Sequence, residues 1–168
     1  MKSRISFKAH QVTAADIAAQ IKHQLGDKWL PTLYVQRVLR LRTRQYRFEK
    51  PQPTARISIQ HTLLGIELKI GRQRLLCPDL ATARYLSIFA LAGCREVAIP
   101  YDITKISHLA DELESSWHRM LLLADQFTQK QTDRFAVRLR HLLFANIRDE
   151  IQAVGAAAKG RDSQRPPK

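Results

Sequence analysis

The sequence predicts an α+β protein: a small mixed β-sheet with helices packed on it, followed by two long C-terminal helices. Three observations support this class. Apolar residues recur every three or four positions before residue 50 and after residue 102, which is typical of amphipathic helices. Between residues 56 and 77 the period changes to two, which indicates strands with one buried face. The 168 residues, 45% of them hydrophobic, are enough for one ordinary core.

The first 26 residues predict an extended segment and then a short helix. Apolar and polar residues alternate over residues 5–10, as in a short strand or an extended arm. Thr13 is a good N-cap, with Asp16 at the third helical position, and Gly26 ends the apolar spacing that follows. We therefore expect one α+β domain over residues 1–154, beginning with these two elements. A disordered basic tail is expected over residues 155–168.

The segment from Trp29 to Glu49 combines an apolar pattern with a row of arginines. Pro31 is suited to the start of a helix. Apolar side chains then follow at helical spacing, with arginines in a second line beside them: Tyr34, Val38, Leu41 and Phe48 in the first, and Arg37, Arg40, Arg44 and Arg47 in the second. Read as a strand, the segment still places Arg40, Arg42 and Arg44 on one face. The apolar spacing favours the helix, and either structure makes the arginines one-sided.

The middle of the chain predicts a three-stranded meander and a crossover unit. The meander covers residues 55–61, 66–70 and 73–77, with turns at residues 63–65 and 71–72. Pro78 and Asp79 open a helix that Gly93 stops, and the apolar segment Glu96–Pro100 follows as a strand. Because strand, helix and strand come in this order, we expect the last strand to run parallel to one of the meander strands.

The last third predicts two amphipathic helices, one opened by Asp102 or Thr104 and one starting near Thr132. The first is unusually rich in apolar residues, and two interpretations of that surplus remain open. The helix is either buried on two sides by its own domain or used as a dimerisation or docking face. The residues that would form this partner surface are Leu113, Trp117, Met120 and Leu121.

The charge of the chain is strongly basic and unevenly distributed. The formal net charge is +13 at pH 7 and the pI is about 10.4. Residues 1–50 contain 11 Lys and Arg against three Asp and Glu, whereas residues 103–154 contain seven of each. A basic excess of this kind is typical of proteins that meet phosphate, in nucleic acid or at an anionic membrane.

The arginine row therefore predicts a non-catalytic nucleic-acid-binding protein that uses this segment and the basic tail. Guanidinium groups donate in pairs to phosphate oxygens and are weakly hydrated, which suits this contact. Tyr46 could stack on a base if its ring is exposed, but a buried tyrosine is the favoured interpretation. The opposite hypothesis is that the arginines pair internally with the acidic residues of the first long helix: Asp111, Glu112 and Glu114. The predicted phosphate-binding residues are Arg37, Arg40, Arg42, Arg44, Arg47, Arg56 and Lys28.

A second hypothesis comes from Glu67 and Lys69, which the tripeptide Glu-Leu-Lys places on one face of a strand. The strand, the helix and the further strand that follow resemble the central part of the PD-(D/E)xK nuclease core. This resemblance implies that Glu67 would bind a divalent metal and that Lys69 would position a water. The pattern departs from that family because residues 56–65 contain no acidic residue. An inactive relative, or a solvated ion pair, is favoured over an enzyme.

The remaining features exclude other site types. Cys77 and Cys94 are too few for a disulfide framework and lack metal-ligand spacing, so buried free thiols are expected. The sequence shows no secretory signal pattern and no apolar run of membrane-spanning length, which predicts a cytoplasmic protein without membrane insertion. No cofactor is expected outside the nuclease alternative. A third hypothesis is an adaptor or assembly factor that forms a homodimer or binds an acidic protein.

Overall fold

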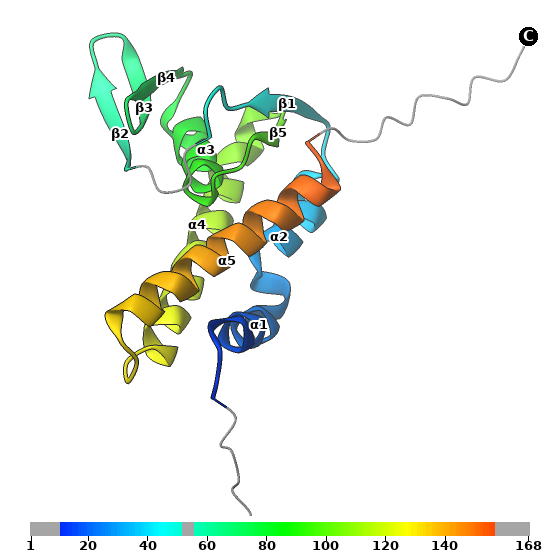
Figure 1. The fold of residues 1–168 in the computed structure, drawn as a ribbon. Helices are drawn as coiled ribbons and strands as arrows, with labels where there is room; N and C mark the ends of the chain where they lie inside the picture. The colour runs from blue at the N-terminus through cyan, green and yellow to red at the C-terminus, as the bar shows by residue number, and fades with distance from the viewer. Residues whose placement is uncertain (1–10, 52–55, 157–168) are drawn as a thin grey trace, which may run out of the picture.

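The computed structural model describes residues 11–51 and 56–156 and confirms the α+β class, with two small antiparallel sheets and two long C-terminal helices (Figure 1). The predicted extended segment at residues 5–10, and most of the predicted tail, lie outside the described residues. The elements are α1 (Ala14–Leu25), η1 (Gly26–Lys28), α2 (Leu30–Leu33), η2 (Tyr34–Val38), β1 (Thr43–Arg47), β2 (Ile57–Thr62), β3 (Gly65–Ile70), β4 (Gln73–Cys77), α3 (Leu80–Ala92), β5 (Glu96–Pro100), α4 (Ile103–Phe127) and α5 (Asp133–Val154).

The predicted capping residues begin and end the helices. The Thr13 hydroxyl accepts from the Asp16 N–H at 3.2 Å, and the Asp16 carboxylate accepts from the Thr13 N–H at 3.0 Å, so α1 starts with a complete capping box. Asp79, Asp102 and Thr132 cap α3, α4 and α5 in the same side-chain-to-backbone manner. Gly93 ends α3 with a φ of 77°, in the left-handed region that glycine adopts without strain.

The predicted continuous helix over residues 29–49 is wrong. The helical part ends at Val38, after a wide turn in which the Leu39 N–H donates to the Tyr34 carbonyl at 3.1 Å. The chain then turns and becomes strand β1, whose register runs from Thr43 opposite Pro100 to Arg47 opposite Glu96. The four side chains of the predicted apolar seam still pack inward, but they do not come from one helix. Tyr34 and Val38 belong to η2, whereas Leu41 and Phe48 lie on either side of β1 in the chain.

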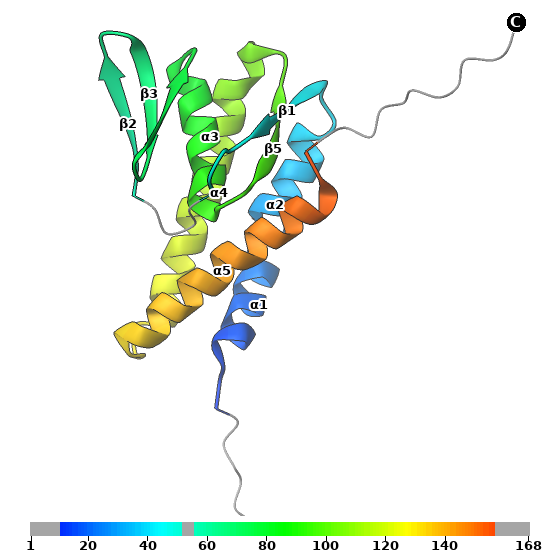
Figure 2. The same ribbon diagram turned by 45° about the horizontal axis from the view of Figure 1, so that its top comes forward.

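The meander prediction is confirmed: β2, β3 and β4 pair antiparallel in chain order. Alternate residues of the central strand β3, among them Leu68 and Ile70, are buried on the face that packs against α3. This inner face is why the meander and α3 stay together. Figure 2 shows the meander flanked by α3 on one side only.

The crossover prediction for β5 is wrong. β5 does not join the meander as a parallel strand but pairs antiparallel with β1 in a second, two-stranded sheet. Hydrogen bonds from the Phe48 N–H to the Arg95 carbonyl (2.9 Å) and from the Tyr101 N–H to the Arg42 carbonyl (3.0 Å) extend the ladder at both ends. The helix prediction for residues 29–49 and the crossover prediction for β5 failed for the same reason. Assigning residues 43–47 to a helix removed the strand with which β5 pairs.

Two buried tyrosines occupy the other edge of β5. The Ala98 N–H donates to the Tyr34 hydroxyl at 2.9 Å, and the Tyr85 hydroxyl donates to the Ala98 carbonyl at 2.6 Å. The Tyr34 hydroxyl donates in turn to the Gly155 carbonyl at 3.2 Å, just after α5. Side chains from η2 and α3 thus take the place of a neighbouring strand and satisfy polar groups that would otherwise be buried unpaired.

The helices enclose one hydrophobic cluster that reaches from α1 to β5. α4 and α5 pack against each other and against α1 and α3, as Figures 1 and 2 show for their crossing ribbons. The indole of Trp29 is buried and donates to the Glu150 carboxylate at 2.5 Å, while Lys22 pairs with the same carboxylate. This contact joins the N-terminal segment to α5.

Candidate nucleic-acid interface

The arginines of the segment from Trp29 to Glu49 lie around the turn that leads into β1. Arg37 belongs to η2, Arg40 and Arg42 to the turn that follows, and Arg44 and Arg47 to β1. All five are exposed. They do not form a helical ladder, because the chain changes from helix to strand in their midst. Exposure follows instead from the turn and from the position of β1 at the edge of its two-stranded sheet.

Two of the five arginines have acidic partners, and three have none in the part of the chain that the structure describes. Arg37 Nε lies 3.6 Å from Glu112 Oε2, and Arg47 Nε lies 3.6 Å from Glu96 Oε1, with both arginine side chains more than half exposed. Exposed pairs at such distances are weak and readily exchanged for other anions. Arg40, Arg42 and Arg44 form no ion pair with a described carboxylate. Internal pairing therefore accounts for only part of the row.

The acidic residues of α4 are occupied mainly by other partners. Arg84 of α3 donates to Glu114 through two nitrogens, at 2.9 and 2.7 Å, and to Asp111 at 2.5 Å. These two carboxylates raise the pKa of the Arg84 guanidinium. Glu112 Oε1 lies 3.0 Å from His108 Nε2, and its other carboxylate oxygen faces Arg37. The α3–α4 contact thus uses most of the negative charge that could have neutralised the arginine row.

Tyr101 adds an aromatic surface that the sequence analysis did not identify. It directly follows β5, is 54% exposed, and its ring carries the Arg42 guanidinium 5.1 Å from the ring centroid. Tyr46 is half-buried and packs edge-on against Phe48 at 5.1 Å, closer to the favoured interpretation of a buried ring than to a base-stacking one. The only sequence signal for Tyr101 was its position immediately after a strand end, and β1 had to be recognised before that position could be related to Arg42.

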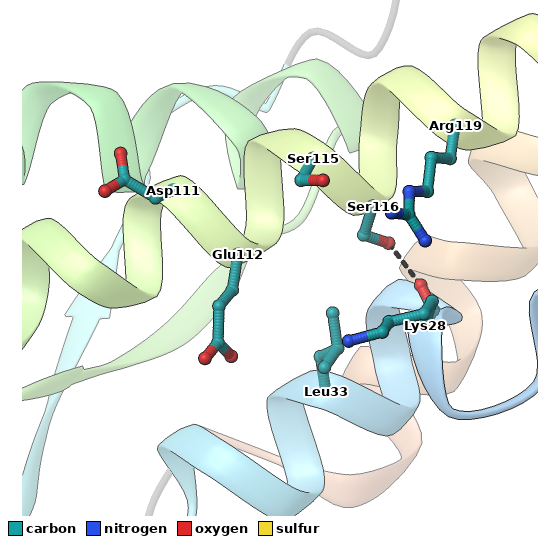
Figure 3. Close-up of a pocket in the computed structure, with 7 residues that line it drawn as sticks. All are labelled: Lys28, Leu33, Asp111, Glu112, Ser115, Ser116 and Arg119. Carbon is teal, nitrogen blue, oxygen red and sulfur yellow. Dashed lines mark hydrogen bonds between the residues drawn. The ribbon is translucent and has the colours of Figure 1, made fainter.

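Lys28 lies elsewhere, in a pocket of about 230 Å³ between η1, α2 and α4. Figure 3 shows the Ser116 hydroxyl bonded to the Lys28 carbonyl, at 2.5 Å, beside the basic Arg119 and the acidic Asp111 and Glu112. None of the arginines at 40, 42 and 44 lines this pocket. Its mixed charge makes it a poor phosphate site, so the structure does not unite Lys28 with the arginine row.

Arg56 lies next to the turn between β3 and β4. Its carbonyl accepts from the Gly71 N–H at 2.9 Å, and its side chain is exposed. The same turn is tied to the end of the β1 segment, because the Gln73 side-chain amide donates to the Lys50 carbonyl at 3.2 Å. The meander and β1 are thereby neighbours on the surface, and Arg56 belongs to the meander side of that surface.

The predicted partner face of α4 is mostly core. Leu113, Trp117 and Met120 are each less than 5% exposed, and the Trp117 ring stacks on Phe144 of α5 at 4.7 Å. Leu121 is partly buried against the same cluster. The surplus of apolar residues arises because α4 packs on α1, α3 and α5 at once. These side chains are therefore not available as a docking face.

The Glu67–Lys69 hypothesis loses its structural frame. β5 stands in a separate sheet, so the sheet order that the nuclease resemblance implies does not form. The residue opposite Glu67 on β2 is Gln60, and one Glu67 oxygen is buried with no hydrogen-bond partner among the residues that the structure describes. Over the ranges 11–51 and 56–156, no group of three or more His, Cys, Asp or Glu residues is placed to hold a metal ion.

The two cysteines are free and buried, as predicted. Among the helices of the described residues, none has the length and hydropathy needed to cross a bilayer. Comparison of the chain with protein-family models, with curated proteins and with solved structures gives no match.

Proposed function

We propose that this protein binds nucleic acid without catalysing a reaction, through a surface formed by Arg40, Arg42, Arg44 and Tyr101. The observation that supports it is that an exposed aromatic ring lies beside three exposed arginines, none of which forms an ion pair with a carboxylate in the part of the chain that the structure describes. Unpaired guanidinium groups can donate to phosphate without first leaving a carboxylate. The ring offers a base a stacking surface that needs no particular sequence.

The weaker ion pairs extend this surface. Arg37 and Arg47 lie at its two ends and can exchange partners 3.6 Å away for phosphate at small cost. Up to five phosphates are then contacted by one contiguous stretch of chain. Affinity from such contacts is independent of sequence and falls steeply as the salt concentration rises, because each contact releases counterions from the nucleic acid.

The test is a triple variant, Arg40→Gln, Arg42→Gln and Arg44→Gln, compared with a control of equal charge change, Lys130→Gln, Arg134→Gln and Arg138→Gln. Arg134 and Arg138 are exposed on α5, and Lys130 is exposed in the turn before it. None of the three forms an ion pair with any described carboxylate. Binding of fluorescent single- and double-stranded DNA and RNA is measured by anisotropy over a series of salt concentrations. We expect the first variant to lower the slope of log Kd against log salt by about 2 to 3, and the control to change it much less.

Two outcomes contradict the proposal. One is a wild-type protein that binds no oligonucleotide at 50 mM salt. The other is equal loss in both triple variants, since that would show only a response to net charge. Polyglutamate of matched charge serves as a competitor, and binding as tight as that of DNA would favour an acidic protein partner instead.

A further inference from the structure

The outer face of the meander, on the side away from α3, carries a second basic cluster. Leu68 and Ile70 turn toward α3, so the alternating residue Lys69 points outward. Arg74 stands directly opposite Lys69 in the β3–β4 register and is exposed. Arg72 lies in the turn between the two strands, and Arg56 adjoins that turn through its bond to Gly71.

The Lys69–Arg74 pair is electrostatically unfavourable in the isolated protein. Like charges at directly opposed positions destabilise an antiparallel pair, whereas opposite charges there are stabilising. None of the four basic side chains forms an ion pair with a carboxylate of the described residues. Glu67, two positions along the same face, is not within pairing distance of Lys69 either. Among the described residues, the repulsion is therefore left without an internal counter-charge.

The positive charge of the outer meander face limits which partners can bind there. In the portion of the chain that Figures 1 and 2 draw as ribbon, no helix lies over it. The same face of a second copy would bring lysine and arginine against lysine and arginine, which is repulsive. An anionic backbone removes the repulsion and lets both side chains donate at once.

We propose that the outer face of the meander, through Lys69, Arg74, Arg72 and Arg56, is a second phosphate-contacting surface for the same nucleic acid. This inference depends on the proposed function. The hydrogen bond between Gln73 and Lys50 places the β3–β4 turn beside the end of the β1 segment, so one strand can pass from the β1 arginines to the meander. A nucleic acid that follows this path is held through more of its phosphates than either surface could contact alone.

The test uses Lys69→Gln with Arg74→Gln and a matched control, Arg134→Gln with Arg138→Gln. The control pair is also a like-charge pair, four residues apart on α5, with both side chains exposed. For single-stranded and duplex DNA at about 0.1 M salt, we expect the meander variant to bind about tenfold more weakly and to lower the salt slope by about 2. Its melting temperature should stay level or rise by about 1 to 3 °C, because the repulsion is gone.

A charge-preserving swap, Lys69→Arg with Arg74→Lys, should keep wild-type affinity. Unchanged affinity and salt slope in the Gln variant, while the Arg40/Arg42/Arg44 variant loses binding, would overturn this inference and leave the proposed function standing. Equal weakening in the swap and Gln variants would also overturn it, since the side-chain shapes rather than the charges would then matter. A wild-type protein that binds no DNA defeats both proposals together.

Discussion

Arg42 and Tyr101 are held together by one contact, and the proposed function uses both side chains. The guanidinium lies over one face of the Tyr101 ring, which holds both side chains in place while the ring remains 54% exposed. A base can stack on such a ring while the guanidinium donates to a neighbouring phosphate. The contact arises because the Tyr101 N–H bonds the Arg42 carbonyl at the end of the β1–β5 ladder.

Substituting Tyr101 by alanine should therefore weaken binding of single-stranded DNA or RNA by about 1 to 3 kcal/mol, or roughly 5- to 150-fold in Kd. Tyr101→Phe should keep most of the affinity, because stacking uses the ring and not the hydroxyl. Duplex binding should change less, since bases inside a duplex are not free to stack on a side chain. Anisotropy titrations check all three, and an equal effect on single strands and duplex would argue against base stacking.

The exposure of individual arginines could not be predicted from the sequence. The spacing of the row was visible, but its partners lie far away in the chain: Glu112 for Arg37 and Glu96 for Arg47. Whether Asp111 and Glu114 would neutralise the row depended on Arg84, which takes both. The basic character of the segment was visible in the sequence, while the exposure of each arginine and the pairing within the row required the tertiary structure.

At the scale of elements, the sequence predicted a helix or strand correctly where the local pattern and the long-range pairing favour the same structure. Capping residues such as Thr13 and Asp79 set helix starts, and a period of two set the meander, because both depend on neighbours a few positions away. The segment from residue 29 to 49 failed for the opposite reason. Its apolar spacing fitted a helix, but β5 is buried on every residue after Glu96 and needs a strand beside it. Pairing with the distant strand β5 therefore determined the structure of residues 43–47, against their local helical pattern.

The same demand explains the tyrosines beside β5. With β1 on one edge, the Ala98 N–H and C=O on the other edge are satisfied by the Tyr34 and Tyr85 hydroxyls. Tyr85→Phe should leave the buried Ala98 carbonyl without a donor and lower the free energy of unfolding by about 1 to 3 kcal/mol. Tyr46→Phe removes a hydroxyl that makes no hydrogen bond with the described residues, at a half-buried site, and should cost less than about 0.5 kcal/mol. Urea unfolding of both variants measures the difference, and equal losses would contradict the role assigned to Tyr85.

At the scale of the whole molecule, charge and burial are separated. The basic side chains proposed to contact phosphate lie on β1, the adjoining turn and the outer meander, while Tyr34 and Cys94, whose pKa values are raised by burial, lie in the core. Burial raises the pKa of the Tyr34 phenol from 10.0 to about 12, an effect that its hydrogen bond with Ala98 partly offsets. Burial likewise raises the pKa of the Cys94 thiol from 9.0 to about 12, with a smaller opposing effect of Arg148. The basic surface and the alkaline stability of the fold can therefore be tested independently.

Both shifts give the folded protein a predictable sensitivity to alkali. Above pH 9 the unfolded chain releases the Cys94 proton, and above pH 10 the Tyr34 proton, while the folded state keeps both until about pH 12. The unfolded state then binds fewer protons, so the free energy of unfolding falls as pH rises, by at most about 1.4 kcal/mol per pH unit for each group. Urea unfolding between pH 7 and 11, under reducing conditions, should show this decline. Cys94→Ala should make the decline above pH 9 shallower without abolishing it, because burial also raises the pKa of the Cys77 thiol. An unchanged pH profile in that variant would contradict the burial of the Cys94 thiol as a cause of the decline.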